Sequence, residues 1–340
     1  MSRFLFPLAE VPSPQGGVNV ILDMIDILVE AGHSAHVVYQ SASYAYSYHE
    51  ISTPSFWDKR LAGAWARGGW RQKIKARLPS RRSASVNEPL KLRKSDIIVI
   101  PEIRFPEIAV LYPDNRKICL VQGYMPFANA VRRLGDADNI FTSDTKYIAT
   151  SEKCVQAVRT LMSREPEEIV LKVSGPKAGA DRIKKPKIAY MPRKLKEHVQ
   201  VVVPSLKHLP EAAHFDFVSL SGLTHKEVIQ EFSESLLFLS FSNEEGFGLP
   251  PAEAMACECI VIGYTGVGGD EFFTSDVGFP IPSGDLMQFV ETTKNVLREY
   301  ASDPTRLDAM RRHASDSILT RYTAERFRQT TLNAFGKVDK

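Results

Sequence analysis

Residues 242–271, SNEEGFGLPPAEAMACECIVIGYTGVGGDE, hold the most informative pattern of the sequence. An apolar run, LLFLSF at 236–241, precedes it, and a second apolar run, CIVIGY at 259–264, lies within it. Between the two runs lie a turn rich in glycine and proline and the helix-forming segment EAMA. Short apolar runs bounded by turn residues are typical of buried strands. The order strand, helix, strand predicts a parallel sheet with helices on its faces.

Two glutamates, Glu245 and Glu253, bracket the turn. One interpretation is a hydrolytic acid and base pair, which requires carboxylates about 5 to 9.5 Å apart. In a single helix these two residues would lie about 12 Å apart along the axis. The two glycines and two prolines between them also forbid such a helix. The hydrolytic pair is therefore rejected.

A binding turn fits the same residues better. One of the two prolines suits the first turn of a helix that runs through Glu253, because a missing N–H costs nothing there. The turn at 246–249 then covers the helix N-terminus, where backbone amides and the helix dipole attract anions. Carboxylates beside such a site are suited to sugar hydroxyls. The simpler alternatives are a capping role for Glu253 and a solvated loop role for Glu244 or Glu245.

The same alternation of strands and helices runs through both halves of the chain. In the first half, the apolar runs predict strands and the helical spacing of apolar residues predicts helices between them. A second series follows the polar segment 174–187, and the pattern is helical from Gly284 to the end. The predicted strands are FLFPLA (4–9), HVVYQ (36–40), DIIVIPE (96–102), KICLVQG (117–123), KYIAT (146–150), KIAYMP (187–192), FDFVSL (215–220), LLFLSF and CIVIGY.

This pattern predicts an α/β protein of two Rossmann-like, doubly wound domains facing a cleft, with ligands at the carboxyl ends of the strands. We place the N-terminal domain at 1–176 and the C-terminal domain at 177–320. The C-terminal helix at 321–340 is expected to pack back toward the N-terminal domain. One segment stays open: VQVVV at 199–203 fits a strand by its β-branched residues and a helix by its spacing.

Composition excludes several classes of protein. The chain has 340 residues, 44% of them hydrophobic, and a net charge of +3, which is too small to indicate a nucleic-acid partner. Four cysteines offer no disulfide framework at this length and are interpreted as reduced thiols of a cytoplasmic protein. Since no run approaches about 18 apolar residues, any membrane contact is expected to be peripheral.

At residues 245–253 the sequence resembles the retaining, nucleotide-sugar-dependent glycosyltransferases of the GT-B fold, of the group 1 or family 4 type. Their signature is Glu-x7-Glu within an EGFGLPxLEAMACG pattern, and Glu245 and Glu253 have the same spacing. A weaker resemblance extends to Gly16-Gly17, to YIATSE at 147–152 and to IAYMPRK at 188–194.

The resemblance implies a donor site in the second domain. Glu245 would contact the donor sugar, Glu253 would bind the ribose hydroxyls, and Arg193 would grip the diphosphate. A lysine usually assists that arginine about five residues later, but position 198 is histidine, so Lys194 or Lys196 must take the role. The backbone of the turn would approach the sugar and diphosphate, and a glycine loop would close around the nucleotide. These backbone positions are Phe247, Gly248, Leu249, Gly268 and Gly269.

The acceptor is expected to bind the first domain near Gly16, Gly17 and Gln122. Gln122 stands where many relatives carry a histidine, so it either takes a polar contact role or the acceptor side is built differently. A second departure is Glu258, which replaces the glycine that usually ends the EAMAC helix. We expect a strained backbone there.

Two further motifs are weaker. Asp136-Ala-Asp138 matches the Asp-x-Asp of manganese-binding transferases of a different fold, and a solvated or capping role is favoured instead. The segment 59–82 holds nine Lys or Arg and no acidic residue, interleaved with tryptophans. It is either a solvated insertion or a patch for an anionic membrane or an anionic acceptor; nucleic acid is the least favoured partner.

The combined prediction is a cytoplasmic glycosyltransferase, with a peripheral position at the inner face of the membrane if segment 59–82 binds lipid. It would move a sugar from a nucleoside diphosphate sugar, with retention and with no metal or cofactor, to a glycan, lipid-linked or polyanionic acceptor. The resemblance implies front-face displacement. Two rivals stay open, a GT-B sugar-nucleotide epimerase and a non-catalytic nucleotide-sugar-binding module.

Overall fold

The computed structural model describes residues 2–338, apart from 14, 66–85, 134–143 and 177–182. The chain divides into two compact units. The first comprises Met1–Thr150, Cys154–Val170 and Arg328–Lys340, and the second comprises Ser151–Lys153 and Leu171–Phe327. The main division therefore falls between Val170 and Leu171, earlier in the chain than the boundary of 176 drawn from composition.

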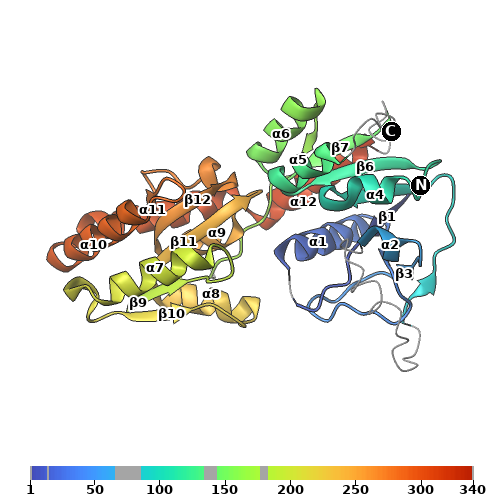
Figure 1. Ribbon diagram of the computed structural model, residues 1–340. Helices are drawn as coiled ribbons and strands as arrows, with labels where there is room; N and C mark the ends of the chain where they lie inside the picture. The colour runs from blue at the N-terminus through green and yellow to red at the C-terminus, as the bar shows by residue number, and fades with distance from the viewer. Residues whose placement is uncertain (1, 14, 66–85, 134–143, 177–182, 339–340) are drawn as a thin grey trace. The chain divides into compact units, whose positions relative to one another are not determined.

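The first unit is built on an eight-stranded sheet in the order β4-β3-β2-β1-β5-β6-β7-β8 (Figure 1), and every pair is parallel. The strand order reverses between β1 and β5, so this is the point where an open α/β sheet binds ligands. The strands are β1 (Arg3–Pro7), β2 (Ser34–Tyr39), β3 (Phe56–Trp57), β4 (Glu88–Pro89), β5 (Ile97–Pro101), β6 (Arg116–Val121), β7 (Lys146–Ala149) and β8 (Glu167–Glu168).

Helices follow the strands of this sheet as the apolar periodicity predicts. The helix after β1 begins at Gly16, and Val20, Met24 and Leu28 place its apolar stripe in the core. The helices are α1 (Gly16–Glu30), α2 (Leu61–Trp65), η1 (Glu102–Arg104), α4 (Phe105–Ala109), α5 (Tyr124–Arg132) and α6 (Glu152–Met162).

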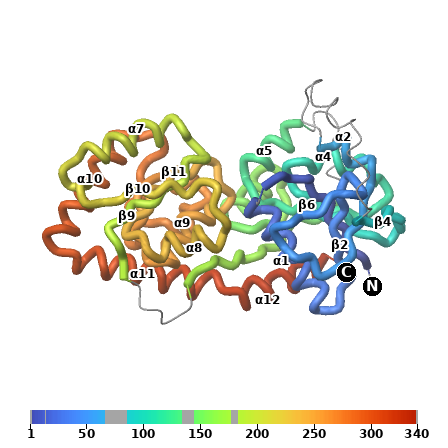
Figure 2. Tube along the Cα trace, turned by 90° about the horizontal axis from the view of Figure 1, so that it is seen from below, coloured from blue at the N-terminus to red at the C-terminus, as the bar shows by residue number. Residues whose placement is uncertain are grey.

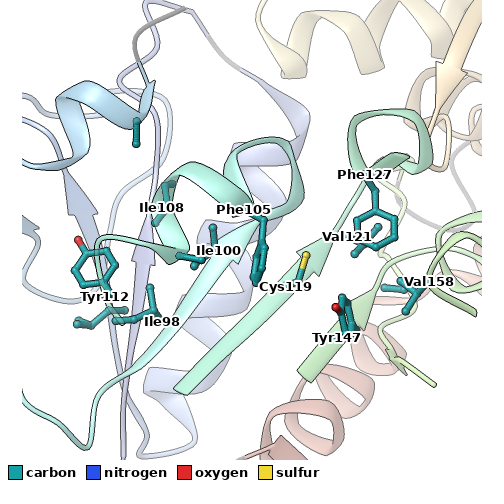
Figure 3. Close-up of a cluster of buried hydrophobic side chains, with 14 of the residues drawn as sticks. Ile98, Ile100, Phe105, Ile108, Tyr112, Cys119, Val121, Phe127, Tyr147 and Val158 are labelled. Carbon is teal, nitrogen blue, oxygen red and sulfur yellow. The ribbon is translucent and has the colours of Figure 1, made fainter. Parts of the chain in front are cut away.

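The core of the first unit lies on strands β5 and β6 (Figure 3). Ile98 and Ile100 of β5 pack with Phe105 and Ile108 of α4, and Phe127 of α5 meets Tyr147 of β7 edge-on at 6.2 Å between ring centroids. These side chains are almost fully buried, which fixes the strand ends that carry Glu102 and Gln122.

Helix α12 (Ala324–Val338) begins in the second unit and ends in the first. Its Phe335 ring lies 5.1 Å from the ring of Phe4 on β1, and Arg328 forms an ion pair of 2.6 Å with Glu30 at the end of α1. Figure 2 shows the two helices α1 and α12 side by side. The C-terminal part of α12 thus packs in the first unit's core.

The second unit is built on a five-stranded parallel sheet in the order β10-β9-β11-β12-β13. Its strands are β9 (Lys185–Tyr190), β10 (Asp216–Ser219), β11 (Ser235–Glu245), β12 (Ile260–Val267) and β13 (Phe279–Pro280). Its helices are α7 (Lys196–Lys207), η2 (Pro210–Ala212), α8 (His225–Glu234), α9 (Leu249–Ala256), η3 (Gly268–Glu271), α10 (Leu286–Ser302) and α11 (Thr305–Arg321). With the first unit, this confirms two doubly wound α/β domains.

The ambiguous segment 199–203 is helical and lies within α7. Val199, Val202, Val203 and Leu206 are buried on one face, so the helical spacing of the apolar residues outweighs the strand preference of β-branched side chains. All four cysteines are buried, and none of them forms a disulfide. No helix in the described part of the chain is long and apolar enough to cross a membrane.

Candidate functional site

Strand β11 delivers Glu245 to the carboxyl end of the second sheet. The pairing of β11 with β12 shifts register between Ser242 and Glu245, and Glu244 adopts a φ of +49°. Such a bulge bends a strand and redirects the side chain that follows it. Glu245 therefore emerges at the edge of the sheet, where α/β proteins bind ligands.

Helix α9 begins at Leu249 with proline in its first turn, as the sequence predicts. Its N-cap is Gly248, whose φ of +96° is a conformation that suits glycine. Because Pro250 and Pro251 have no N–H, the helix N-terminus offers fewer donors than an ordinary one. The backbone N–H groups of residues 246–249, which precede these prolines, are the donors of this turn that could bind an anion.

Lys194 is the lysine that meets Glu245. Its Nζ lies 2.6 Å from Glu245 Oε1 and donates a hydrogen bond of 3.0 Å to the carbonyl of Asn243. The two segments come together because β9, which leads to Lys194, pairs directly with β11. Lys196, the other candidate lysine, lies on the first turn of α7.

A cavity of about 500 Å³ opens at Arg193, the residue before Lys194 in the chain. It lies at the ends of β9 and β10 and at the start of α7, and its size suits a small-molecule ligand. Arg193 and Lys196 both line it, and neither has an ion pair with another described residue. The lining residues are Met191, Pro192, Arg193, Lys196, Val199, Gln200, Leu220, Ser221 and Gly222.

Glu253 lies in α9 with its side chain only 9% exposed. Its Oε1 lies 2.7 Å from Nε2 of His225, the first residue of α8. His225 was missed by sequence reasoning. The available signal was Thr-His-Lys-Glu at 224–227, a capping box that places His225 at the start of a helix after a strand.

The glycine loop packs against the turn that carries Glu245. A Cβ on Gly268 would lie 2.4 Å from the carbonyl oxygens of Glu245 and Gly246, so only glycine fits. Gly269 follows it in the buried start of η3. The structure therefore brings this loop and the predicted binding turn together.

Glu258 is strained, as expected, and has a partner. It adopts a φ of +61°, its N–H donates to Met255 O at 2.8 Å, and the N–H of Cys259 donates to Ala254 O at 2.9 Å. These two bonds form a Schellman motif, which usually carries glycine at this position. The Glu258 carboxylate lies 2.5 Å from Arg311 on α11, so the side chain ties two helices together.

In the first unit, the predicted acceptor residues lie together at the reversal of strand order. Gly16 and Gly17 open α1, and Gln122 Nε2 donates a hydrogen bond of 3.1 Å to Gly17 O. Glu102, which follows β5, was not singled out from the sequence. Burial raises the pKa of Glu102 to about 7, although the backbone N–H groups of Gln122 and Gly123 donate to its carboxylate.

Two weaker motifs fall largely outside the described residues. Asp136 and Asp138 lie within 134–143, and most of the basic segment lies within 66–85. Of the described part, Arg60 is bound to the buried carboxylate of Asp58 at 2.6 Å and stacks over Tyr112. Arg60 therefore has a structural role.

Residues 151–314 match the family model of glycosyl transferases group 1. Most of the matched residues belong to the second unit. An alpha-1,6-glucosyltransferase from Actinobacillus pleuropneumoniae serotype 7 (strain AP76) is 29% identical over 126 residues, which is 36% of this chain. The match spans 38% of that relative's length.

Solved glycosyltransferase structures share the architecture of the whole chain. The pneumococcal O-GlcNAc transferase GtfA, in complex with UDP and GlcNAc, aligns with a TM-score of 0.67, 11% identity and 99% coverage of both chains. Anabaena HepE in complex with UDP-glucose aligns with a TM-score of 0.66 and 14% identity, covering 99% of this chain and 100% of HepE. At these identities the likeness establishes the fold, which is GT-B.

Proposed function

We propose that the protein is a retaining glycosyltransferase that moves a sugar from UDP-sugar to a hydroxyl acceptor without a metal ion. The observation that carries the proposal is the ion pair of Lys194 with Glu245, because Arg193, the residue before Lys194, lines a cavity of ligand size. Glu245 follows β11 and could bind sugar hydroxyls, whereas Arg193 and Lys194 follow the adjacent strand β9 and could bind a diphosphate.

The donor base is proposed to be uracil. Guanine presents an N1–H and a 2-amino group, which call for a carboxylate or several carbonyl acceptors. No described residue lining the cavity is acidic, and its polar groups are those of Arg193, Lys196, Gln200 and Ser221 together with backbone atoms. Uracil has a single N–H donor and two carbonyl acceptors, which suit such a lining. GtfA and HepE, which share the fold, bind uridine nucleotides.

The proposed mechanism depends on stabilising the negative charge that develops on the leaving diphosphate. As the bond between C1 of the sugar and the diphosphate oxygen breaks, negative charge grows on the β-phosphate, and Arg193 and Lys194 are proposed to stabilise it. Each such charge pair at about 4 Å contributes up to about 4 kcal/mol at an effective dielectric near 20. The acceptor oxygen attacks C1 from the same face, and its proton passes to the leaving diphosphate. Configuration is therefore retained.

The acceptor is proposed to be a glycan, a lipid-linked or a polyanionic molecule that meets Gly16, Gly17 and Gln122. The hydrogen bond from Gln122 to Gly17 fixes the Gln122 amide, whose Oε1 accepts no hydrogen bond from a described residue and is proposed to accept one from a sugar hydroxyl. An additional contact of segment 59–82 with an anionic membrane stays part of the proposal.

A thermal-shift panel of UDP-, GDP-, ADP- and dTDP-sugars tests the donor. UDP-sugars are expected to raise Tm most, and slow release of UDP in the absence of acceptor is expected to be insensitive to EDTA. Glu245→Ala should abolish UDP release while leaving Tm within a few degrees. A Glu245→Ala protein with an undiminished rate contradicts the site.

The same assay separates the rival functions. A non-catalytic binding module would bind UDP-sugar without releasing UDP. An epimerase would convert the sugar without net release of UDP. Release of UDP together with transfer of the sugar to an acceptor would therefore favour the transferase.

A further inference from the structure

We infer that His225 is a positioning residue of the donor site, which holds the Glu253 carboxylate in place for the ribose hydroxyls. This inference rests on the proposed function, in which Glu253 binds the ribose. Its basis is the contact between His225 Nε2 and Glu253 Oε1 at 2.7 Å. Nothing in the group 1 signature around Glu245 and Glu253 names a histidine at this place.

The contact matters because Glu253 is buried. Only 9% of its side chain is exposed, and a buried carboxylate is costly unless a donor satisfies it. In the described part of the chain, His225 is the one side chain that donates to Glu253, and it uses Oε1. The second oxygen, Oε2, has no hydrogen-bond donor among the described residues, so it is available to a hydroxyl.

His225 is itself held firmly at its backbone. It opens α8 between Thr224 and Glu227, whose capping box fixes the first turn: Thr224 N donates to Glu227 Oε2 at 2.7 Å, and Glu227 N donates to Thr224 Oγ1 at 3.3 Å. The imidazole is nevertheless 55% exposed. A fixed backbone with an exposed ring is suited to orienting a neighbouring group at a ligand site.

The function of the contact is preorganisation. The terminal torsion of a glutamate is broad and roughly two-fold, so an unrestrained carboxylate rotates. A hydrogen bond to one oxygen restricts that rotation before the ligand arrives. The ribose then binds without the cost of ordering the carboxylate, and the gain appears as affinity for ribose hydroxyls.

The ligand itself provides the control for this inference. UDP carries a 2′-hydroxyl and a 3′-hydroxyl, whereas 2′-deoxy-UDP lacks the first. If His225 acts through the carboxylate that binds these hydroxyls, its removal should weaken UDP more than 2′-deoxy-UDP. A purely structural role would weaken both nucleotides by the same factor, because both share the base and the diphosphate.

Calorimetric titration of the full-length protein with UDP and with 2′-deoxy-UDP tests the inference. His225→Ala is expected to raise the Kd of UDP about tenfold and the Kd of 2′-deoxy-UDP less than threefold. His225→Gln retains a donor that reaches Glu253, and it should restore UDP affinity to within about threefold of the parent. His214→Ala, at an exposed histidine of the same unit, is the matched control and should change neither Kd.

The outcomes are distinct. Equal weakening of both nucleotides, no weakening at all, or failure of His225→Gln to recover UDP binding overturns the positioning role. A parent protein that binds neither nucleotide contradicts the proposed function itself. Far-UV circular dichroism and Tm of each variant show whether the Kd values refer to folded protein.

Discussion

Lys194 Nζ and Glu245 Oε1 lie 2.6 Å apart, although 50 residues separate them in the chain. The pairing of β9 with β11 brings their segments together. This ion pair neutralises the Glu245 carboxylate, which would otherwise repel the diphosphate of the proposed donor. In the proposed function it also places the Lys194 cation near the leaving group.

The first prediction separates the two candidate lysines. Lys194→Ala is expected to lower UDP release about 100-fold or more, because it removes a cation and exposes the diphosphate to Glu245. Lys196→Ala, the matched control, removes a cation that lines the cavity without contacting Glu245, and it should raise the donor KM with little change in kcat. Steady-state rates with UDP-glucose measure both. A larger loss of kcat in Lys196→Ala than in Lys194→Ala would indicate that Lys196, and not Lys194, assists Arg193.

The second prediction concerns Arg193. A guanidinium holds two phosphate oxygens at once, whereas an ammonium is a point charge. Arg193→Lys is therefore expected to lower kcat about tenfold or more while keeping measurable UDP binding. Because Arg193 has no ion pair with a described residue, its removal should not change the free energy of unfolding by more than about 0.5 kcal/mol. A clear loss of stability would indicate a structural role instead.

The third prediction tests the strain at Glu258. Glu258→Ala loses the ion pair with Arg311 but keeps a side chain at positive φ, whereas Glu258→Gly loses the same pair and relieves the strain. The glycine variant should therefore be more stable than the alanine variant by about 1 kcal/mol. Urea unfolding of the two variants measures the difference. Equal stability would show that the backbone at residue 258 is not strained.

The fourth prediction concerns the pH dependence of stability through Glu102. Its pKa of about 7 in the folded protein lies above the ordinary 4.5, so the folded state binds more protons between these values. The contribution of Glu102 to the free energy of unfolding is then fully present below about pH 4.5 and is lost as the pH rises through about 7. A difference of that size corresponds to about 3 kcal/mol.

Glu102→Gln should remove this contribution. The parent is expected to lose about 3 kcal/mol more than the variant between pH 5 and pH 8 in urea unfolding. Glu50→Gln, at an exposed glutamate of the same unit, is the control and should follow the parent. Parallel pH profiles for the parent and Glu102→Gln would contradict the burial effect.

Local sequence patterns were sufficient to predict the main strands and helices of both units. Each run of the second half that was predicted as a strand forms one, and the proline-rich start of α9 lies where the helix was predicted, because these features depend on neighbours within a few residues. Glu258 was also predicted to be strained from the helix end alone. Segment 199–203 was undecided because its spacing and its side-chain types favour different structures.

Local sequence patterns account for the two parallel α/β units, the turn of glycine and proline between Glu245 and Glu253, and the glycines that let a second loop approach that turn. Tertiary structure alone decided which lysine meets Glu245, that His225 reaches Glu253, and that Glu102 is buried. The physical reason is that these contacts join the ends of strands and helices whose neighbours are set by sheet order. Sheet order depends on packing across the whole unit, which no short stretch of sequence contains.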